Sequence, residues 1–324
     1  MATTAPAIES LRRLKKTLAG HIVETPVVRC PSIEERLGSG TEVWAKLEFL
    51  QQTGTFKARG ALAVVLSLRA EQRQAGVTAV SAGNHAIATA YAAKVVGTSA
   101  KVVMLGSSNP ARVERCRSYG AEVVIVDDVH SAFAVAEDIQ QKEGRYFVHP
   151  FEGPETFRGT ATIGLEISEQ VADFDAIIIP VGGGGLCAGI SSAVKQMRPE
   201  VAVYGVEPEG ADSMRRSFAS GKPEPLERVD TIADSLGAPF ALEQSFELCR
   251  DNVDELVVVT DDALKAAMGF LFNSMKVAVE PACAATTAAL LGPLADHLRG
   301  SRVVCVMCGS NIDWQTFARH AEFG

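Results

Sequence analysis

Four adjacent glycines, Gly182 to Gly185, are the segment of this sequence whose chemistry is easiest to predict. They follow the apolar run Ile177 to Val181, and a helix-forming stretch begins directly after them. Residues without side chains allow successive backbone N–H groups to converge on an anion, and the start of a helix adds partial positive charge. The alternative is a tight turn that needs glycine only for its dihedral angles. The residues expected to hold a phosphate are Gly182, Gly183, Gly184, Gly185 and Leu186.

Two kinds of cofactor fit such a phosphate site. Gly183, Gly185 and Ala188 satisfy the GxGxxA spacing of dinucleotide-binding turns, and Glu207 follows Ala188 by 207 − 188 = 19 residues. Read alone, this segment predicts a nicotinamide-dependent oxidoreductase. That interpretation leaves Lys57 and the polar loops described below without a role.

Lys57 is the best candidate for a reactive amine. It stands between Phe56 and small residues, where a helix is expected to begin and where the helix dipole disfavours a cation. Taken alone, it is more typical of a solvated helix lysine. Together with a phosphate site, a desolvated lysine predicts a Schiff base with pyridoxal 5′-phosphate (PLP).

The elements that must position these groups alternate between short β-branched runs and longer helical stretches, which predicts an α/β fold with parallel sheets. Strands are expected at Val77–Val80, Lys101–Leu105, Ala121–Val126, Ala176–Val181, Val201–Val206, Glu255–Val259 and Arg302–Val306. Helices are expected at His85–Val96, Arg112–Ser118, Ser131–Glu143, Leu186–Met197 and Asp261–Met275. We expect a smaller unit at residues 73–151, inserted into a larger one formed by residues 1–72 and 152–324.

Three unusual loops follow predicted strands: Ser81 to His85, the glycine run, and Cys308 to Asn311. In open α/β sheets, ligands bind beyond the carboxyl ends of the strands, so these loops predict one cleft. The loop from Ser81 leads into a helix and is suited to an anion. The simpler alternatives are that Asn84 caps this helix and that His85 lies on its surface.

Composition excludes several classes of protein. The 324 residues are 47% hydrophobic and 22% charged, which predicts a globular protein with a sizeable core. The formal charge of −8 argues against nucleic acid as a partner, and no apolar run approaches the roughly 20 residues of a membrane span. The seven cysteines lack zinc-site spacing and are typical of a reducing cytoplasm, with Cys305 expected as a buried strand thiol.

Four segments of the sequence resemble, in the same order, the landmarks of the threonine/serine dehydratase and serine racemase family, which has PLP fold type II. They are Thr55 to Ala61, Ser81 to Ala86, Pro180 to Gly185 and Gly309 to Asp313. Smaller similarities are Thr25-Pro26-Val27, Ala45 to Glu48, His149-Pro150-Phe151, Thr231 to Asp234 and Val279-Glu280-Pro281. The resemblance implies a tryptophan synthase β-like fold, with two open parallel-sheet α/β domains and the cofactor in the cleft between them.

The resemblance also implies roles for individual residues. Lys57, beside Phe56, would carry the cofactor, and Asn84 would bind its phenolic oxygen. Cys308 stands where the family usually has a serine at the pyridine nitrogen. The substrate carboxylate would lie on the loop formed by Ser81, Ala82, Gly83, Asn84 and His85.

Departures from the family pattern concern racemisation, metal binding and the substrate. Racemases have a serine where this sequence has Ala82, and a methyl group cannot exchange protons. The family's cation ligands correspond to Glu207, Ala211 and Ser213, so that an aspartate is missing and a hard-cation site is weakened. Phe157 to Thr162 and Ser235 also depart from the pattern, which leaves the substrate open.

These observations predict a PLP-dependent dehydratase, or ammonia-lyase, that converts a β-hydroxy-α-amino acid to a 2-oxo acid and ammonium. L-Threonine or L-serine is the default substrate, and a hydroxyaspartate or a bulkier analogue stays open. The alternatives are β-replacement, racemisation, an NAD(P)-dependent oxidoreductase and a sensor that binds without turnover. Family members are commonly homodimers. Only 324 − 313 = 11 residues follow Asp313, so we expect no regulatory domain there.

Overall fold

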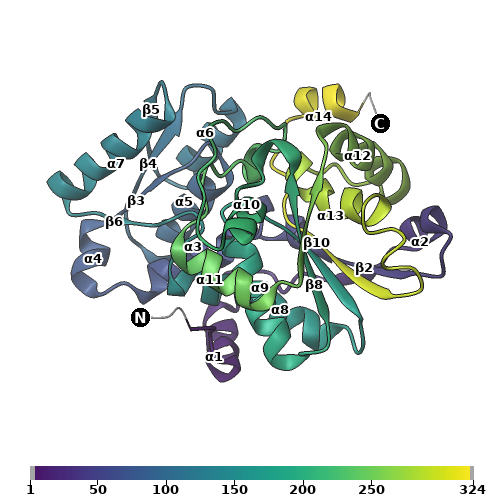
Figure 1. Cartoon of the computed structure of the whole chain (residues 1–324). Coiled ribbons are helices and arrows are strands. Elements are labelled where there is room, and N and C mark those ends of the chain that lie inside the picture. Colours follow the sequence, from purple (N-terminus) through teal and green to yellow (C-terminus); the bar gives the residue numbers. More distant parts are fainter. Residues whose placement is uncertain (1–3, 322–324) are drawn as a thin grey trace.

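The structure of the protein, a computed structural model, describes residues 4–321 and contains two β-sheets (Figure 1). The larger sheet has six strands in that part of the chain. Their spatial order is β1 (Val27–Arg29), β2 (Glu42–Leu47), β10 (Arg302–Met307), β7 (Ala176–Pro180), β8 (Ala202–Pro208) and β9 (Glu255–Val259). Neighbouring strands are parallel, except that β1 runs antiparallel to β2. The predicted parallel-sheet α/β architecture is therefore confirmed, with one antiparallel strand added at this edge.

Helices cover both faces of the larger sheet, as a parallel sheet of apolar strands requires. All five residues of β7 are buried, and so is every residue of α13 (Pro281–Leu291) except its last, Leu291. Helix α13 packs against β7 and β10, and α12 (Asp261–Met275) lies between it and α14 (Trp314–Ala321). On the other side lie α8 (Pro154–Gln170), α9 (Gly185–Met197), α1 (Ile8–Leu18) and α11 (Glu243–Asn252).

The smaller sheet has the order β5 (Glu122–Val126), β4 (Ala100–Leu105), β3 (Val77–Val80) and β6 (Tyr146–Phe147), all parallel. Helices α5 (Asn84–Val96) and α6 (Pro110–Ser118) contact it, as does α7 (Val129–Glu143). These strands lie together at one side of the molecule, away from β2, β8 and β10 (Figure 1). They all come from residues 77–147. The limits proposed for the smaller unit, 73–151, stay a prediction.

Helix α3 (Lys57–Ser67) connects the helices of the larger sheet to those of the smaller one. It packs against α8 and against α5, and α4 (Ala70–Ala75) follows it. Elsewhere the chain forms α2 (Pro31–Leu37) and α10 (Ser213–Ser220). Short 3₁₀ helices lie at Glu48–Leu50, Gln52–Gly54, Glu209–Ala211 and Asp234–Leu236. Among the helices of residues 4–321, none has both the length and the apolar composition needed to cross a bilayer.

All seven predicted strands are confirmed, with ends within two residues of those expected. The three that were not predicted are short or interrupted by charge: β1 has three residues, β6 has two, and β2 contains Lys46. The buried position of Cys305 in β10 is also confirmed. The three predicted loops lie close together. Asn311 of the third loop donates a hydrogen bond to Asn84 of the first, and His85 of the first loop lines the same cavity as Gly185 of the glycine run.

Candidate active site

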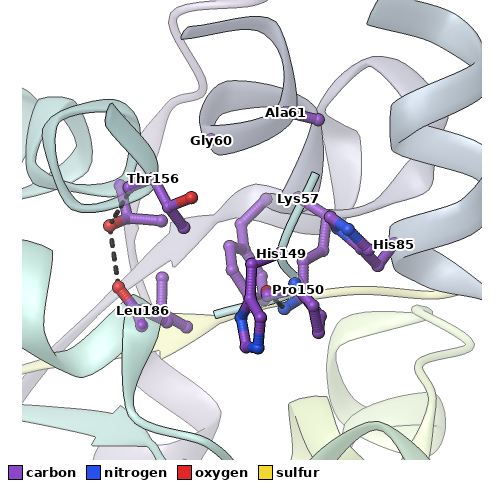
Figure 2. A pocket seen from close by; sticks show the side chains of 11 residues that line it. Lys57, Gly60, Ala61, His85, His149, Pro150, Thr156 and Leu186 are labelled. Atoms are coloured by element: carbon purple, nitrogen blue, oxygen red, sulfur yellow. Dashed lines mark hydrogen bonds between the residues drawn. The ribbon is translucent and has the colours of Figure 1, made fainter. Parts of the chain in front are cut away.

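Lys57 is the first residue of α3 and faces a narrow cavity, where its Nζ atom donates a hydrogen bond to the carbonyl of Pro150 at 2.5 Å (Figure 2). The cavity walls include Phe56, His85, His149 and Leu186. Burial lowers the pKa of Lys57 from 10.5 to about 8, against the opposing influence of Cys308 and Glu280. An appreciable fraction of this amine is therefore uncharged, and so nucleophilic, near neutral pH.

A buried cluster of charges anchors the start of α3 two residues beyond Lys57. The Arg59 guanidinium donates to Glu48 at 2.9 Å and to Glu166 at 2.7 and 2.8 Å, and Lys46 reaches Glu166 at 2.6 Å. All four side chains are at most 1% exposed. We call this set, Lys46, Glu48, Arg59 and Glu166, the Arg59 cluster. It fixes the helix that carries Lys57, and the sequence reasoning assigned it no role.

The glycine run has the geometry of an anion cradle at the start of α9. Within residues 4–321, the N–H groups of Gly183, Gly184, Gly185 and Leu186 donate no hydrogen bond. A side chain at Gly183 or Gly185 would come within 2.4 Å of Phe151, and Gly184 has φ +89°, which disfavours other residues. Converging unpaired N–H groups at a helix start attract a dianion such as a phosphate ester.

Asn84, the first residue of α5, is held at both ends of its amide. Its Oδ1 accepts from Asn311 Nδ2 at 2.8 Å, and its Nδ2 donates to Glu280 at 2.8 and 3.1 Å and to Ser235 Oγ at 3.0 Å. Glu280 and Asn311 are thus members of the site, yet the sequence reasoning gave neither a role. Their only signal was a place inside segments that resemble the family. Burial raises the pKa of Glu280, and the attraction of Arg112 offsets only part of that rise.

The loop before α5 is held by the Ser81 hydroxyl at its start and by the buried His85 at its end. Ser81 Oγ accepts a hydrogen bond from Gly83 N–H at 3.1 Å. His85 turns inward, where its Nε2 lies 2.7 Å from the Val148 carbonyl. Burial, with the nearby Lys57, lowers the pKa of His85 to about 3. The ring is therefore neutral at physiological pH and adds no positive charge for a substrate carboxylate.

His149 is a second neutral imidazole beside Lys57 (Figure 2). Its Nδ1 accepts from the N–H groups of Phe151 and Glu152 at 3.3 and 3.0 Å, which places the ring proton on Nε2. Burial lowers its pKa to about 4. The ring packs edge-to-face on Phe151, 4.7 Å between centroids, and Phe151 contacts Phe240 at 6.3 Å. We call His149, Phe151 and Phe240 the aromatic wall; of these three, His149 lines the Lys57 cavity.

Comparison with known proteins agrees with this geometry. A family model described as "Pyridoxal-phosphate dependent enzyme" matches residues 18–309. The chain belongs to this family. It is 52% identical to a phenylserine dehydratase of Ralstonia pickettii over 322 residues, 99% of this chain and 98% of that one. It is 38% identical to an L-threonine ammonia-lyase of Thermotoga maritima over 307 residues, 94% of this chain and 76% of that one. The structure of maize serine racemase superposes with a TM-score of 0.91 and 35% identity, covering 98% of this chain and all of that one.

Membership identifies PLP as the cofactor and confirms PLP fold type II. It also decides between the two meanings of the glycine run, since the nicotinamide interpretation finds no support in the family that matches. The GxGxxA spacing arose because several glycines follow one another before a helix, a pattern that any phosphate cradle of this kind can produce.

Cys308 lies directly after β10, next to the Lys57 segment. Its carbonyl accepts the N–H of Phe56 at 3.1 Å, and its thiol is buried. Hydrogen bonding to Cys283, together with burial, raises the pKa of the Cys308 thiol well above its usual value. The group therefore stays protonated and uncharged. It fits a neutral partner for the pyridine nitrogen of PLP.

The three residues matched to the family's cation ligands lie between β8 and α10. The Glu207 carboxylate accepts the N–H groups of Met214 and Arg215 at 2.9 and 2.8 Å and so caps α10. Burial raises its pKa to about 8, against these two bonds. Ala211 is buried, and the buried hydroxyl of Ser213 has no partner among the described residues. Residues 4–321 contain no cluster of three or more His, Cys, Asp or Glu side chains that could hold a metal.

Proposed function

We propose that this protein is a PLP-dependent ammonia-lyase that eliminates water from a β-hydroxy-α-amino acid and yields a 2-oxo acid and ammonium. The observation that carries the proposal is the enclosed Lys57 amine with its lowered pKa, opposite a cradle of unpaired backbone N–H groups. The family match and the dehydratases among the relatives support it.

The residues present fit the cofactor. The unpaired N–H groups of Gly183 to Leu186 suit the phosphate, the Lys57 amine suits the aldehyde, and the neutral Cys308 suits an uncharged pyridine nitrogen. Asn84 suits the phenolic oxygen once its NH₂ group gives up one of the hydrogen bonds that it donates here to Glu280 and Ser235. When bound, PLP withdraws electrons from the substrate's Cα and so eases removal of the Cα proton.

In this scheme, Lys57 Nζ takes the Cα proton, as a general base with a pKa near the working pH. In the loop from Ser81 to His85, the unpaired backbone N–H groups of Ala82, Asn84 and His85 bind the substrate carboxylate. The C–O bond at Cβ breaks, and the hydroxyl leaves as water with the proton that Lys57 removed from Cα. The released enamine is then hydrolysed by water to the 2-oxo acid and ammonium. Ala82 has no proton to exchange, so elimination is favoured over racemisation.

For the substrate we propose an aryl-substituted β-hydroxy amino acid such as 3-phenylserine, in preference to threonine or serine. The phenylserine dehydratase at 52% identity supports this choice. So does the aromatic wall of His149, Phe151 and Phe240, because edge-to-face contacts stabilise a bound phenyl ring.

The test is a panel of 3-phenylserine, L-threonine, L-serine and 3-hydroxyaspartate, each followed by formation of its 2-oxo acid. We expect the highest kcat/KM for 3-phenylserine. Lys57→Ala should lose at least about 10³-fold in kcat, the scale of a lost general base and attachment point, together with its visible absorption. An intact yellow holoenzyme that forms no 2-oxo acid from any of the four would overturn the assignment.

Three further proposals concern cation binding, assembly and location. The unpaired Ser213 hydroxyl near the Glu207 carboxylate supports a weak cation site formed by Glu207, Ala211 and Ser213. We propose that the protein is a homodimer. We also propose that it is located in the cytoplasm, and the seven free thiols support this location. Activity in potassium, magnesium and EDTA tests the cation, and light scattering on the eluted holoenzyme tests the dimer.

A further inference from the structure

Arg112 is a mostly buried cation that belongs to neither the predicted cofactor site nor the predicted substrate loop. It lies in the first turn of α6, beside the smaller sheet, and its side chain is 12% exposed. Its Nε and Nη2 atoms donate to the Asn311 carbonyl at 2.9 and 2.7 Å, and Nη1 donates to Asp234 at 2.5 Å. Both partners lie in loops beside the larger sheet. The side chain therefore joins the two halves of the molecule.

The stem of Arg112 rests directly on the loop that precedes α5. A Cβ atom at Gly83 would lie 2.5 Å from Arg112 Cδ and 2.9 Å from its Nε and Nη1. Such distances mean that Arg112 occupies the space a side chain at position 83 would need. Its position is therefore coupled to that of the loop from Ser81 to His85.

From Arg112, a chain of hydrogen bonds leads to Asn84. Asn311, whose carbonyl Arg112 holds, donates from its Nδ2 to Asn84 Oδ1 and to the Thr53 carbonyl, both at 2.8 Å. Arg112 Nη2 also lies 3.9 Å from Glu280, the carboxylate that accepts from Asn84 Nδ2. The guanidinium thus lies beside two of the three residues that orient the Asn84 amide, Asn311 and Glu280.

The charges around Arg112 are already balanced in this arrangement. Burial alone would lower its pKa, but Asp234 and Glu280 raise it, so the side chain stays a cation. Three of its five N–H donors already bind Asn311 and Asp234 beside the larger sheet. Its main role is therefore to hold these segments to α6 rather than to bind a ligand from solvent.

We propose that Arg112 is a positioning residue for the substrate: it clamps α6 to Asn311 and Asp234 and thereby holds the loop Ser81 to His85 closed over the site. The inference rests on the proposed function, because it assigns the substrate carboxylate to that loop. This loop recognises the α-carboxylate of an amino-acid substrate. Loss of the clamp weakens substrate binding and leaves the glycine cradle unchanged.

The test compares Arg112→Met, which keeps the apolar stem over Gly83 but removes every donor, with Arg112→Lys, which keeps the charge. Arg117→Ala, an exposed arginine on the same helix with only a 3.9 Å pair to Glu114, is the matched control. Loss of charge-assisted hydrogen bonds predicts a KM for 3-phenylserine about tenfold higher in Arg112→Met, with kcat within about threefold. Arg112→Lys should fall between, and Arg117→Ala should equal the wild type.

Two readouts do not depend on turnover. Binding of L-phenylalanine, which has no β-leaving group, is followed by the change in visible absorption of the holoenzyme, and its Kd should rise about tenfold in Arg112→Met. Hydrogen exchange should accelerate in the peptide covering residues 81–96 and stay unchanged in residues 182–197. Unchanged Kd and unchanged exchange in both Arg112 variants would overturn the clamp. A wild-type holoenzyme that binds L-phenylalanine but forms no 2-oxo acid would instead overturn the proposed function and leave the clamp intact.

Discussion

Two polar networks flank the site, and they differ in what they connect and in how deeply they are buried. The Arg59 cluster lies entirely among elements around the larger sheet, and its four side chains are at most 1% exposed. A second network, the Arg112 cluster, comprises Asn84, Arg112, Asp234, Glu280 and Asn311 and bridges the smaller and larger sheets. Its Asp234 is 51% exposed. An enclosed network within one half suits a fixed base, whereas a half-exposed network between halves suits a contact that opens to admit substrate.

The pKa values of Glu166 in the first network and Glu280 in the second are shifted in opposite directions. Burial alone would raise the pKa of Glu166, but Arg59 and Lys46 hold it below its usual value. Burial raises the pKa of Glu280, and Arg112, whose Nη2 lies 3.9 Å away, does not compensate for it fully. Direct double pairing with cations thus keeps one carboxylate ionised, while the other is easily protonated.

The largest effect is expected from breaking the Arg59 cluster. Arg59→Met leaves Glu48 and Glu166 buried with a single cation, Lys46, and should lower the free energy of unfolding by about 3–5 kcal/mol. Urea denaturation of the holoenzyme measures it. The control is Arg12→Met, since Arg12 is 53% exposed and pairs with Glu9 at 3.4 Å, and it should change stability by less than about 0.5 kcal/mol. A cost for Arg59→Met as small as that of the control would contradict the anchoring role.

A pH comparison separates the two carboxylates. A pKa lowered by folding means that the contribution of Glu166 is present above about pH 4.5 and lost as the pH falls. A pKa raised by folding means that the contribution of Glu280 is present below about pH 4.5 and lost as the pH rises through the raised pKa.

We therefore compare unfolding free energies of wild type, Glu166→Gln and Glu280→Gln at several pH values. As the pH rises above about 4.5, wild type should lose stability relative to Glu280→Gln. The difference in unfolding free energy between wild type and Glu166→Gln should stay constant above about pH 4.5 and shrink only at lower pH. Parallel pH profiles for the two variants would refute the contrast between the networks.

The smallest effect concerns a second contact between the halves. Asn109 caps α6 through its Oδ1 and donates from Nδ2 to Asp313 at 2.5 Å. Asn109→Ser keeps a capping oxygen and removes the bond to Asp313, which is half-exposed, so a loss of about 0.5–1 kcal/mol is expected. KM for 3-phenylserine should rise by no more than about twofold. A KM effect as large as that of Arg112→Met would mean that closure does not depend chiefly on Arg112.

Much of the fold was predictable because its signals are local. The run Ala176 to Pro180 is apolar and β-branched, and the glycines after it are contiguous in sequence, so both strand and cradle could be located without tertiary information. Lys57 was predictable for a similar reason, since an unusual residue type stood at a helix start. Strand β2 was missed because Lys46, which breaks its apolar pattern, is neutralised by Glu166 from 120 residues away.

The networks that hold the site could not be found in this way. Arg112 reads as one more basic residue on an amphipathic helix, and its partners Asp234 and Asn311 lie 122 and 199 residues further along the chain. Glu280 lies 196 residues from Asn84. Nothing in the local sequence distinguishes such residues from solvated charges.

The sequence by itself determined the fold class and located the candidates for the site, Lys57, the glycine run and the loop from Ser81 to His85, because backbone preferences and residue type act over a few neighbouring positions. Only the tertiary structure decided which distant charges neutralise one another, that His85 and His149 are neutral, and that a single arginine ties the two halves together. The physical reason is that pKa values and buried hydrogen bonds depend on desolvation and on the groups within a few ångströms, and folding alone brings those groups together.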